Sequence, residues 1–295
     1  MQSVATWLVA RPHNAVLALA ATLLLPVLHI LSGAIIVLVV LHRGVRLAVV
    51  EGAIAGLLLV AVALVVAAPM AQVVFSIMAT LLPAVLLALL LQATRSLTLT
   101  LQVSAILAAA AMLVFQLAVN DPVAYWQPVM TALEQWTREN NLQLQGQLLV
   151  AEPELAAEML TLAAVLTRWM LYVLYLLFGY RLYSALPVKT GNFGRFCDLN
   201  FGRVIALTMA LASVIAVVSE ADLLQDIAVV LFAIFSLQGL AIVHWLHIGG
   251  HLPFFVVIAT YVLVPVLHVF LLLALAVLGY TDAWFDYRHR KSSQQ

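Results

Sequence analysis

The chain has 295 residues, of which 65% are hydrophobic and only 9% are charged, and its formal net charge is zero. Soluble domains carry roughly a quarter charged residues and just under half apolar ones. The composition therefore excludes an ordinary water-soluble protein and indicates that lipid is its solvent. The absence of net positive charge argues against a nucleic-acid partner, because phosphate binding needs a basic face. The single cysteine, Cys197, excludes an intrachain disulfide.

Apolar segments follow one another along almost the whole chain. They are Ala15–Leu41, Val45–Ala68, Met70–Leu91, Leu97–Val119, Leu155–Leu186, Val204–Val218, Ile227–Trp245 and Leu252–Gly279. A helix needs about 20 residues to cross about 30 Å of hydrocarbon. Backbone in lipid must satisfy its own hydrogen bonds, and these segments lack the alternation of barrel strands. The sequence therefore predicts an all-α, polytopic transmembrane helical bundle of about eight spans, with residues 1–295 forming a single transmembrane domain.

The first and last segments are longer than one crossing requires. Ala15–Leu41 contains Pro26, and Leu252–Gly279 contains Pro265. Each segment is either one tilted, kinked helix or a hairpin of two short helices, because proline both bends and interrupts helices. If both are hairpins, the preference for cytoplasmic Lys and Arg places every basic cluster inside and every acidic loop outside. If both are single spans, the basic stretch 187–203 lies outside. Both topologies place the two termini in the cytoplasm.

Residues 120–153 form the only sizeable region outside the predicted spans. Within it, Gln127–Asn141 has the spacing of a modest amphipathic helix. Tyr125, Trp126 and Trp136 suit a membrane interface, where an amphipathic ring is partly wet. The region is interpreted as an extramembrane amphipathic connector that lies on the surface, and the alternative is a lid over a cavity.

Two ionisable residues fall inside apolar segments, where a charge needs a partner or a water-filled cavity. These are Arg168 and Glu51, and Glu51 is the natural candidate partner of Arg168. The pair is either structural or part of a ligand site, and Arg168 alone could instead extend to the interface. Gln238 is a further polar group inside a span, so a ligand cavity would be lined by Glu51, Arg168 and Gln238.

The loop 187–203 reads PVKTGNFGRFCDLNFGR and repeats the triplet Phe-Gly-Arg. Arginine binds phosphate or carboxylate with a planar fork, and glycine allows a ligand to approach the backbone. Lys189, Arg195 and Arg203 are therefore candidates for holding an anionic head group. The simpler interpretation is a basic loop that only fixes topology.

Three histidines, His244, His247 and His251, would share one face of a continuous helix, and imidazole is a common metal ligand. They are weak candidates, because Gly249 and Gly250 interrupt the helix and no acidic residue or cysteine accompanies them. We therefore predict no metal. No Walker loop, dinucleotide fingerprint, HExxH or GxSxG motif occurs in the sequence, so no catalytic residues, no cofactor and no enzymatic activity are expected.

Short motifs give the chain a family resemblance. The stretch LGYTDAWFDYRHR (Leu278–Arg290), together with Leu237–Ala241 and Leu41–Gly44, resembles the YybS-like family of bacterial membrane proteins. That family is similar to the substrate-binding subunits of energy-coupling-factor vitamin transporters and to the cell-shape protein MreD. The resemblance implies a multi-pass protein of the bacterial inner membrane whose helices enclose a small-molecule pocket. Because the sequence contains no ATPase motif, pumping would require a separate ATPase.

Three functions are compatible with these patterns. The first is a transport-type protein that binds a small or amphipathic ligand within its helical bundle. The second is a scaffold or assembly protein of the inner membrane, similar to MreD, with partner membrane proteins. The third is a lipid-handling protein that uses the basic loop. All three have the lipid bilayer as their environment and none involves nucleic acid.

Overall fold

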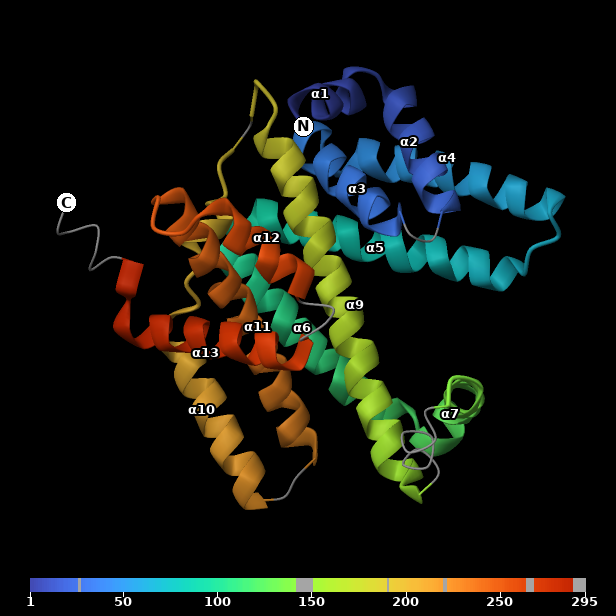
Figure 1. Ribbon diagram of the computed structural model, residues 1–295. Helices are drawn as coiled ribbons and strands as arrows, with labels where there is room; N and C mark the ends of the chain where they lie inside the picture. The colour runs from blue at the N-terminus through green and yellow to red at the C-terminus, as the bar shows by residue number, and fades with distance from the viewer. Residues whose placement is uncertain (26–27, 142–150, 190, 220–221, 264–267, 289–295) are drawn as a thin grey trace. The chain divides into compact units, whose positions relative to one another are not determined.

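The computed structural model describes residues 1–25, 28–141, 151–189, 191–219, 222–263 and 268–288, and these ranges contain helices and no strand (Figure 1). The helices are α1 (Gln2–Ala10), α2 (Pro12–Leu24), α3 (His29–Arg43), α4 (Val45–Val65), α5 (Met70–Thr94), α6 (Leu97–Ala118), α7 (Pro122–Glu139), α9 (Pro153–Ser184), α10 (Gly202–Ser219), α11 (Asp222–Ile248), α12 (Phe254–Leu263) and α13 (His268–Phe285), with a 3-10 turn, η2, at Phe196–Asp198. The predicted all-α class is confirmed.

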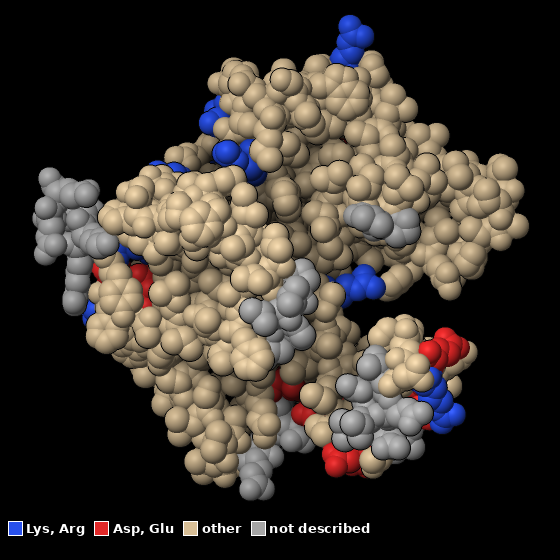
Figure 2. All heavy atoms as spheres, viewed as in Figure 1, with Lys and Arg blue, Asp and Glu red and all other residues tan. Residues whose placement is uncertain are grey.

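Six helices in the described ranges are long and apolar enough to cross a membrane: α4, α5, α6, α9, α10 and α11. They coincide with six of the eight predicted segments. The other two segments, Ala15–Leu41 and Leu252–Gly279, each contain two shorter helices, α2 with α3 and α12 with α13. Uncharged side chains cover most of the face drawn in Figure 2, as expected for a surface that meets lipid. The chain is thus a multi-pass membrane protein.

Contacts group the chain into two compact units. Unit 1 comprises Met1–Ser104, Met170–Phe201 and Leu240–Pro265, and unit 2 comprises Ala105–Trp169, Gly202–Gly239 and Val266–Gln295. The boundaries fall inside α6, α9 and α11. The prolines that made the two divided segments ambiguous, Pro26 and Pro265, lie outside the described residues.

In unit 1, α2 and α3 form a hairpin (Figure 1). Near the break between them, Ser32 Oγ donates a hydrogen bond to Thr22 Oγ1 at 2.8 Å. Ten residues of continuous helix would separate two side chains by about 15 Å, so this contact requires the chain to reverse. At the opposite ends, Arg43 Nη2 donates to the carbonyl of Val9. The hairpin therefore begins and ends at the same end of unit 1, which confirms the hairpin alternative for Ala15–Leu41.

The core of unit 1 is built around α3. Its residues from Ala34 to Leu41 are all buried, and α2, α4 and α5 pack against it. Helix α9 also approaches closely, because a side-chain carbon at Gly179 would collide with Val37 and with the carbonyl of Ala34. Lipid supplies no hydrophobic drive between helices, so such close van der Waals packing is what associates them.

In unit 2, α7 forms most of the predicted connector 120–153. Asp121 caps it by accepting a hydrogen bond from Ala124 N at 2.9 Å. Trp126 donates to Thr161 Oγ1 of α9 at 2.8 Å, and Phe115 packs against Tyr125 and Trp126. A helix is present where the amphipathic helix Gln127–Asn141 was expected, with the bounds Pro122–Glu139, and the connection to α9 contains residues 142–150, which lie outside the described ranges.

Helices α11 and α13 of unit 2 cross in direct backbone contact. A side-chain carbon at Gly239 would collide with the carbonyl of Leu275, and one at Gly279 would collide with the carbonyl of Phe235. Beside this crossing lies the buried carboxylate of Asp282. The crossing depends on glycine at both positions, because any side chain would push the two backbones apart.

Candidate functional site

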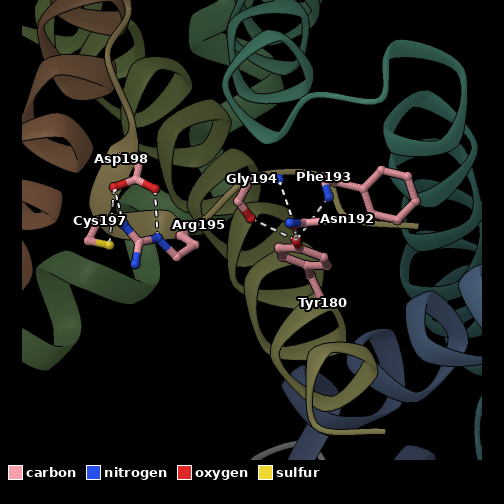
Figure 3. Close-up of polar contacts among 7 residues, drawn as sticks. All are labelled: Tyr180, Asn192, Phe193, Gly194, Arg195, Cys197 and Asp198. Atoms are coloured by element: carbon pink, nitrogen blue, oxygen red, sulfur yellow. Dashed lines mark hydrogen bonds and ion pairs between the residues drawn. The ribbon is translucent and has the colours of Figure 1, made fainter. Parts of the chain in front are cut away.

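Two tyrosines of α9 hold the backbone of the loop between α9 and α10, and Figure 3 draws one of them, Tyr180. Tyr180 donates its hydroxyl hydrogen to Gly194 O at 2.7 Å and accepts from Phe193 N at 3.1 Å. Tyr183 accepts from Gly191 N at 2.9 Å. Phe193 is buried and packs against both tyrosine rings, at centroid distances of 5.8 and 6.0 Å. Tyrosine hydroxyls thus satisfy amide groups that the loop does not satisfy by itself.

Two further contacts tie this loop to α6. Leu97 N donates to Phe193 O at 2.8 Å, and Gln102 Nε2 donates to Phe201 O at 3.1 Å. The loop is therefore held from two helices of unit 1 that are distant in sequence. A loop restrained in this way presents its side chains with little entropy left to lose on binding.

Arg195 and Asp198 form a two-bond ion pair on the loop (Figure 3). Arg195 Nε lies 2.7 Å from Asp198 Oδ2, and Nη2 lies 3.0 Å from Oδ1. This hydrogen bonding raises the pKa of Arg195. Both side chains are exposed, at 70% and 46%, so the pair is worth little in stability. Arg195 is a less available anion ligand than the sequence suggested, because its guanidinium already has a carboxylate partner.

Cys197 lies beside this ion pair and is buried. Burial raises the pKa of its thiol, and the negative charge of Asp198 raises it further. The thiol is therefore a poor nucleophile near neutral pH, since the thiolate is the reactive form. The arrangement favours a structural cysteine over a catalytic one.

The ends of several helices meet at this end of unit 1. Gln92 Nε2, near the end of α5, donates to Val40 O, near the end of α3, at 3.0 Å. Arg95 follows α5, and its Nη1 lies 3.7 Å from the point where a side-chain carbon of Gly191 would start. We call this end of unit 1 the basic end. It comprises the ends of α3, α5 and α9, the start of α4 and the loop 187–201.

Glu51 belongs to the same region, and its partner differs from the predicted one. Arg43 Nη1 donates to Glu51 Oε1 at 2.6 Å, and the two side chains are 14% and 3% exposed. Arg43 ends α3, and Gly44, with φ of +91°, turns the chain directly into α4, so the two residues come within reach. The partner that the structure gives Glu51 is therefore Arg43, where sequence analysis named Arg168. Glu51 Oε2 is buried and receives no hydrogen bond from any described residue.

The other predicted ligand residues are distributed over unit 2. Arg168 is exposed on α9. Gln238 is buried and donates to Asp282 Oδ2 at 2.9 Å, and Arg288 donates to the same oxygen at 2.7 Å. Asp282 thus has both Gln238 and Arg288 as partners. Gln238, Asp282 and Arg288 form a buried structural network of unit 2.

The basic loop contributes to both units. Arg203 belongs to unit 2, where its Nη2 donates to Trp284 O at 3.3 Å. Lys189 is exposed in unit 1. Along the chain Lys189 stands two residues before Gly191, beside which lies the guanidinium of Arg95, a residue that sequence analysis did not include in the site. The only signal for Arg95 was its position between two apolar segments.

The three histidines have separate partners. His244 Nδ1 donates to Leu240 O at 2.9 Å, and His247 Nδ1 donates to Leu252 O at 3.0 Å, because a carbonyl can only accept. The ring of His251 stacks on Trp245, beyond the end of α11. Among the described residues, no group of three His, Cys, Asp or Glu is placed to hold a metal ion.

The fold and this basic end define a polytopic α-helical membrane protein with a preorganised basic loop. Comparison of the chain with protein-family models, with curated proteins and with solved structures finds no match. The resemblance to the YybS-like family therefore stays a prediction.

Proposed function

We propose that this chain is a transport-type membrane protein that binds a small or amphipathic ligand among its helices. The observation that carries the proposal is the α2–α3 hairpin. Its helices have 13 and 15 residues, which correspond to about 20 and 22 Å, less than the ~30 Å of a full crossing. The hairpin would thus enter the membrane and return to the same side.

A chain reversal at this depth needs a special environment. Non-helical backbone inside a bilayer is tolerated only where protein covers it or where it lines a water-filled cavity. Leu24 and Leu25, at the end of α2, are 45% and 54% exposed, so the described part of the chain does not enclose the reversal. Transporters commonly place their ligand sites at broken helices of this kind.

Glu51, which pairs with Arg43 at the end of the hairpin opposite to this reversal, is the residue that we propose to contact the ligand. Its Oε1 is occupied by Arg43, whereas Oε2 is buried and accepts no hydrogen bond from the described residues. A buried carboxylate oxygen without a hydrogen bond costs free energy, so a ligand that donates a hydrogen bond to it removes that cost. The ligand would therefore carry a hydroxyl or ammonium group.

The test is mass spectrometry of small molecules that co-purify with the protein in detergent. Wild type should retain a defined molecule, and Glu51→Gln should reduce its yield per mole of protein. Glu51→Asp serves if the first variant fails to fold, because it keeps the charge for Arg43 and withdraws the carboxylate by one methylene. Glu139→Gln, an exposed acid-to-amide change at the end of α7, is the matched control. Equal retention in wild type and both Glu51 variants would contradict the proposal.

We also propose that the basic end of unit 1 faces the cytoplasm, in the inner membrane of a bacterium. Lysine and arginine collect on the cytoplasmic side. Along the chain, Glu139 precedes and Lys189 follows one long apolar helix, α9, and both residues are exposed. In a Cys197→Ser background, Lys189→Cys should react with an impermeant maleimide only in inverted vesicles, and Glu139→Cys only in intact cells. Labelling of both from one side would refute this orientation.

A second candidate function is a scaffold or assembly protein. The close packing of each unit favours it, since α9 lies directly on α3 at Gly179 and α11 lies directly on α13 at Gly239. Such packing leaves little room for movement inside either unit. A protein that retains no small molecule in the experiment above would favour this candidate.

A further inference from the structure

We propose a second binding site, separate from the one at Glu51: the basic end of unit 1 holds the phosphate group of an anionic lipid between Arg95 and Lys189. A lipid headgroup and free phosphate share this chemistry. The position of the site next to apolar helices favours the lipid, and the experiment below distinguishes the two sources.

Unit 1 contains many more basic than acidic residues. By sequence the unit contains seven Lys and Arg residues but only two acids, Glu51 and Asp198. Both acids are already paired, with Arg43 and Arg195. The remaining cations are exposed and have no acidic partner among the described residues; they are Arg11, Arg46, Arg95, Arg181 and Lys189.

These cations lie at one end of the unit. The hydrogen bond from Arg43 to Val9 joins the end of α3 to the end of α1 near Arg11, and the bond from Gln92 to Val40 joins the end of α5 to the same place. Arg46 lies in the first turn of α4 and Arg181 in the last turn of α9. An unneutralised cluster of this kind attracts anionic lipid, by about 1 kcal/mol per basic residue near the surface.

Arg95 and Lys189 are the two cations that the loop brings together. The guanidinium of Arg95 lies beside Gly191, and the ring of Phe193 lies closer still to the point where a side-chain carbon of Gly191 would start. Lys189 precedes Gly191 by two residues, which limits their Cα separation to about 7 Å. Tyr183 fixes Gly191 through its amide. An arginine fork and a flexible ammonium group at this spacing can grip one phosphate from two sides.

The backbone conformation of Arg95 allows the role of its side chain to be tested. Arg95 is left-handed, with φ of +54°, and its N–H caps the end of α5 by bonding to Leu91 O. Glycine is the usual residue at this position, because it adopts the conformation without steric cost. Ala67, Asn141 and Asp286 share this conformation, so the role of the Arg95 side chain is tested by the Arg95→Gly variant below.

The experiment measures retained lipid by native mass spectrometry of the full chain in a neutral detergent. Wild type should retain phosphatidylglycerol in preference to phosphatidylcholine. The double variant Arg95→Gln/Lys189→Gln removes two charges worth about 1 kcal/mol each and should weaken phosphatidylglycerol binding roughly 30-fold, with phosphatidylcholine unaffected. Arg138→Gln, an exposed arginine of unit 2, is the control. Unchanged phosphatidylglycerol binding in the double variant would overturn the proposal.

Two further measurements separate this proposal from its alternatives. Arg95→Gly should lose phosphatidylglycerol without loss of thermal stability, because glycine suits the left-handed position; a large loss of stability would identify a structural role and overturn the site. Inorganic phosphate at millimolar concentration should not displace the lipid. If inorganic phosphate binds at Arg95 and phosphatidylglycerol does not, the lipid assignment is wrong.

Discussion

The hydroxyl of Tyr180 should control how tightly the loop between α9 and α10 is closed. Tyr180→Phe removes the hydrogen bond to Gly194 O and leaves the buried amide of Phe193 without its acceptor. A hydrogen bond contributes about 1 kcal/mol net, and an unsatisfied buried amide costs about 1–3 kcal/mol. Together these predict that the closed loop loses about 2 kcal/mol relative to locally open forms, which corresponds to a roughly 30-fold larger open population.

The single cysteine of the chain reports on this opening. Cys197 is buried in the same loop, so an alkylating reagent reaches its thiol fully only when the loop opens. When reclosing is faster than labelling, the labelling rate follows the open population. Maleimide labelling of Tyr180→Phe in detergent should therefore be roughly 30-fold faster than labelling of wild type.

Tyr172→Phe is the matched control, because it makes the same chemical change two turns earlier on α9. Tyr172 packs near Tyr175 and has no side-chain hydrogen bond to a described residue. It should leave the labelling rate of Cys197 unchanged. Equal labelling rates in wild type and Tyr180→Phe would refute the reasoning that the tyrosine hydroxyl holds the loop.

Three other changes test separate features. Arg43→Met should destabilise the protein by about 3–5 kcal/mol, because it leaves the buried Glu51 charge unpaired; adding Glu51→Met should restore much of that loss in a denaturation assay. Gly239→Ala should lower thermal stability far more than Gly52→Ala, whose new methyl meets only side-chain ends at 3.3 Å. The pKa of Cys197 is raised, so the midpoint of its labelling rate against pH should lie at a higher pH in the folded chain than in the unfolded chain. The contribution of Cys197 to stability should fall as the pH rises from the unfolded pKa through the folded one. Coincident folded and unfolded curves would contradict this.

Segment lengths were enough to predict the helical architecture. Runs of about 20 apolar residues can only be helices in lipid, and six of them are single long helices. The two segments marked as ambiguous, Ala15–Leu41 and Leu252–Gly279, are the two that divide into shorter helices. The prolines identified which two segments depart from a single straight helix. They did not tell a kinked helix from a hairpin, since both have the same hydropathy.

The residues of the basic end were harder to predict. Hydropathy places a residue along a helix but does not tell which way it faces, so Arg168 and Glu51 looked like partners, whereas Arg43 pairs with Glu51 across a tight turn. Arg95 was not predicted as a site residue, because its proximity to Gly191 depends on a contact between distant segments. Hydrogen bonds between a helix and a distant loop leave no periodic trace in the sequence.

The central position of α3 has a consequence for how the protein is made. Gly33 and Val37 of α3 contact Tyr175 and Gly179 of α9, so the nascent helix cannot complete its packing until the ribosome has added the chain as far as α9. At translation rates of 5–20 residues per second this interval lasts roughly 7–30 s. During that time the short hairpin would have to wait in the bilayer beside α4 and α5, which makes it the stage of biogenesis most open to an insertase or chaperone.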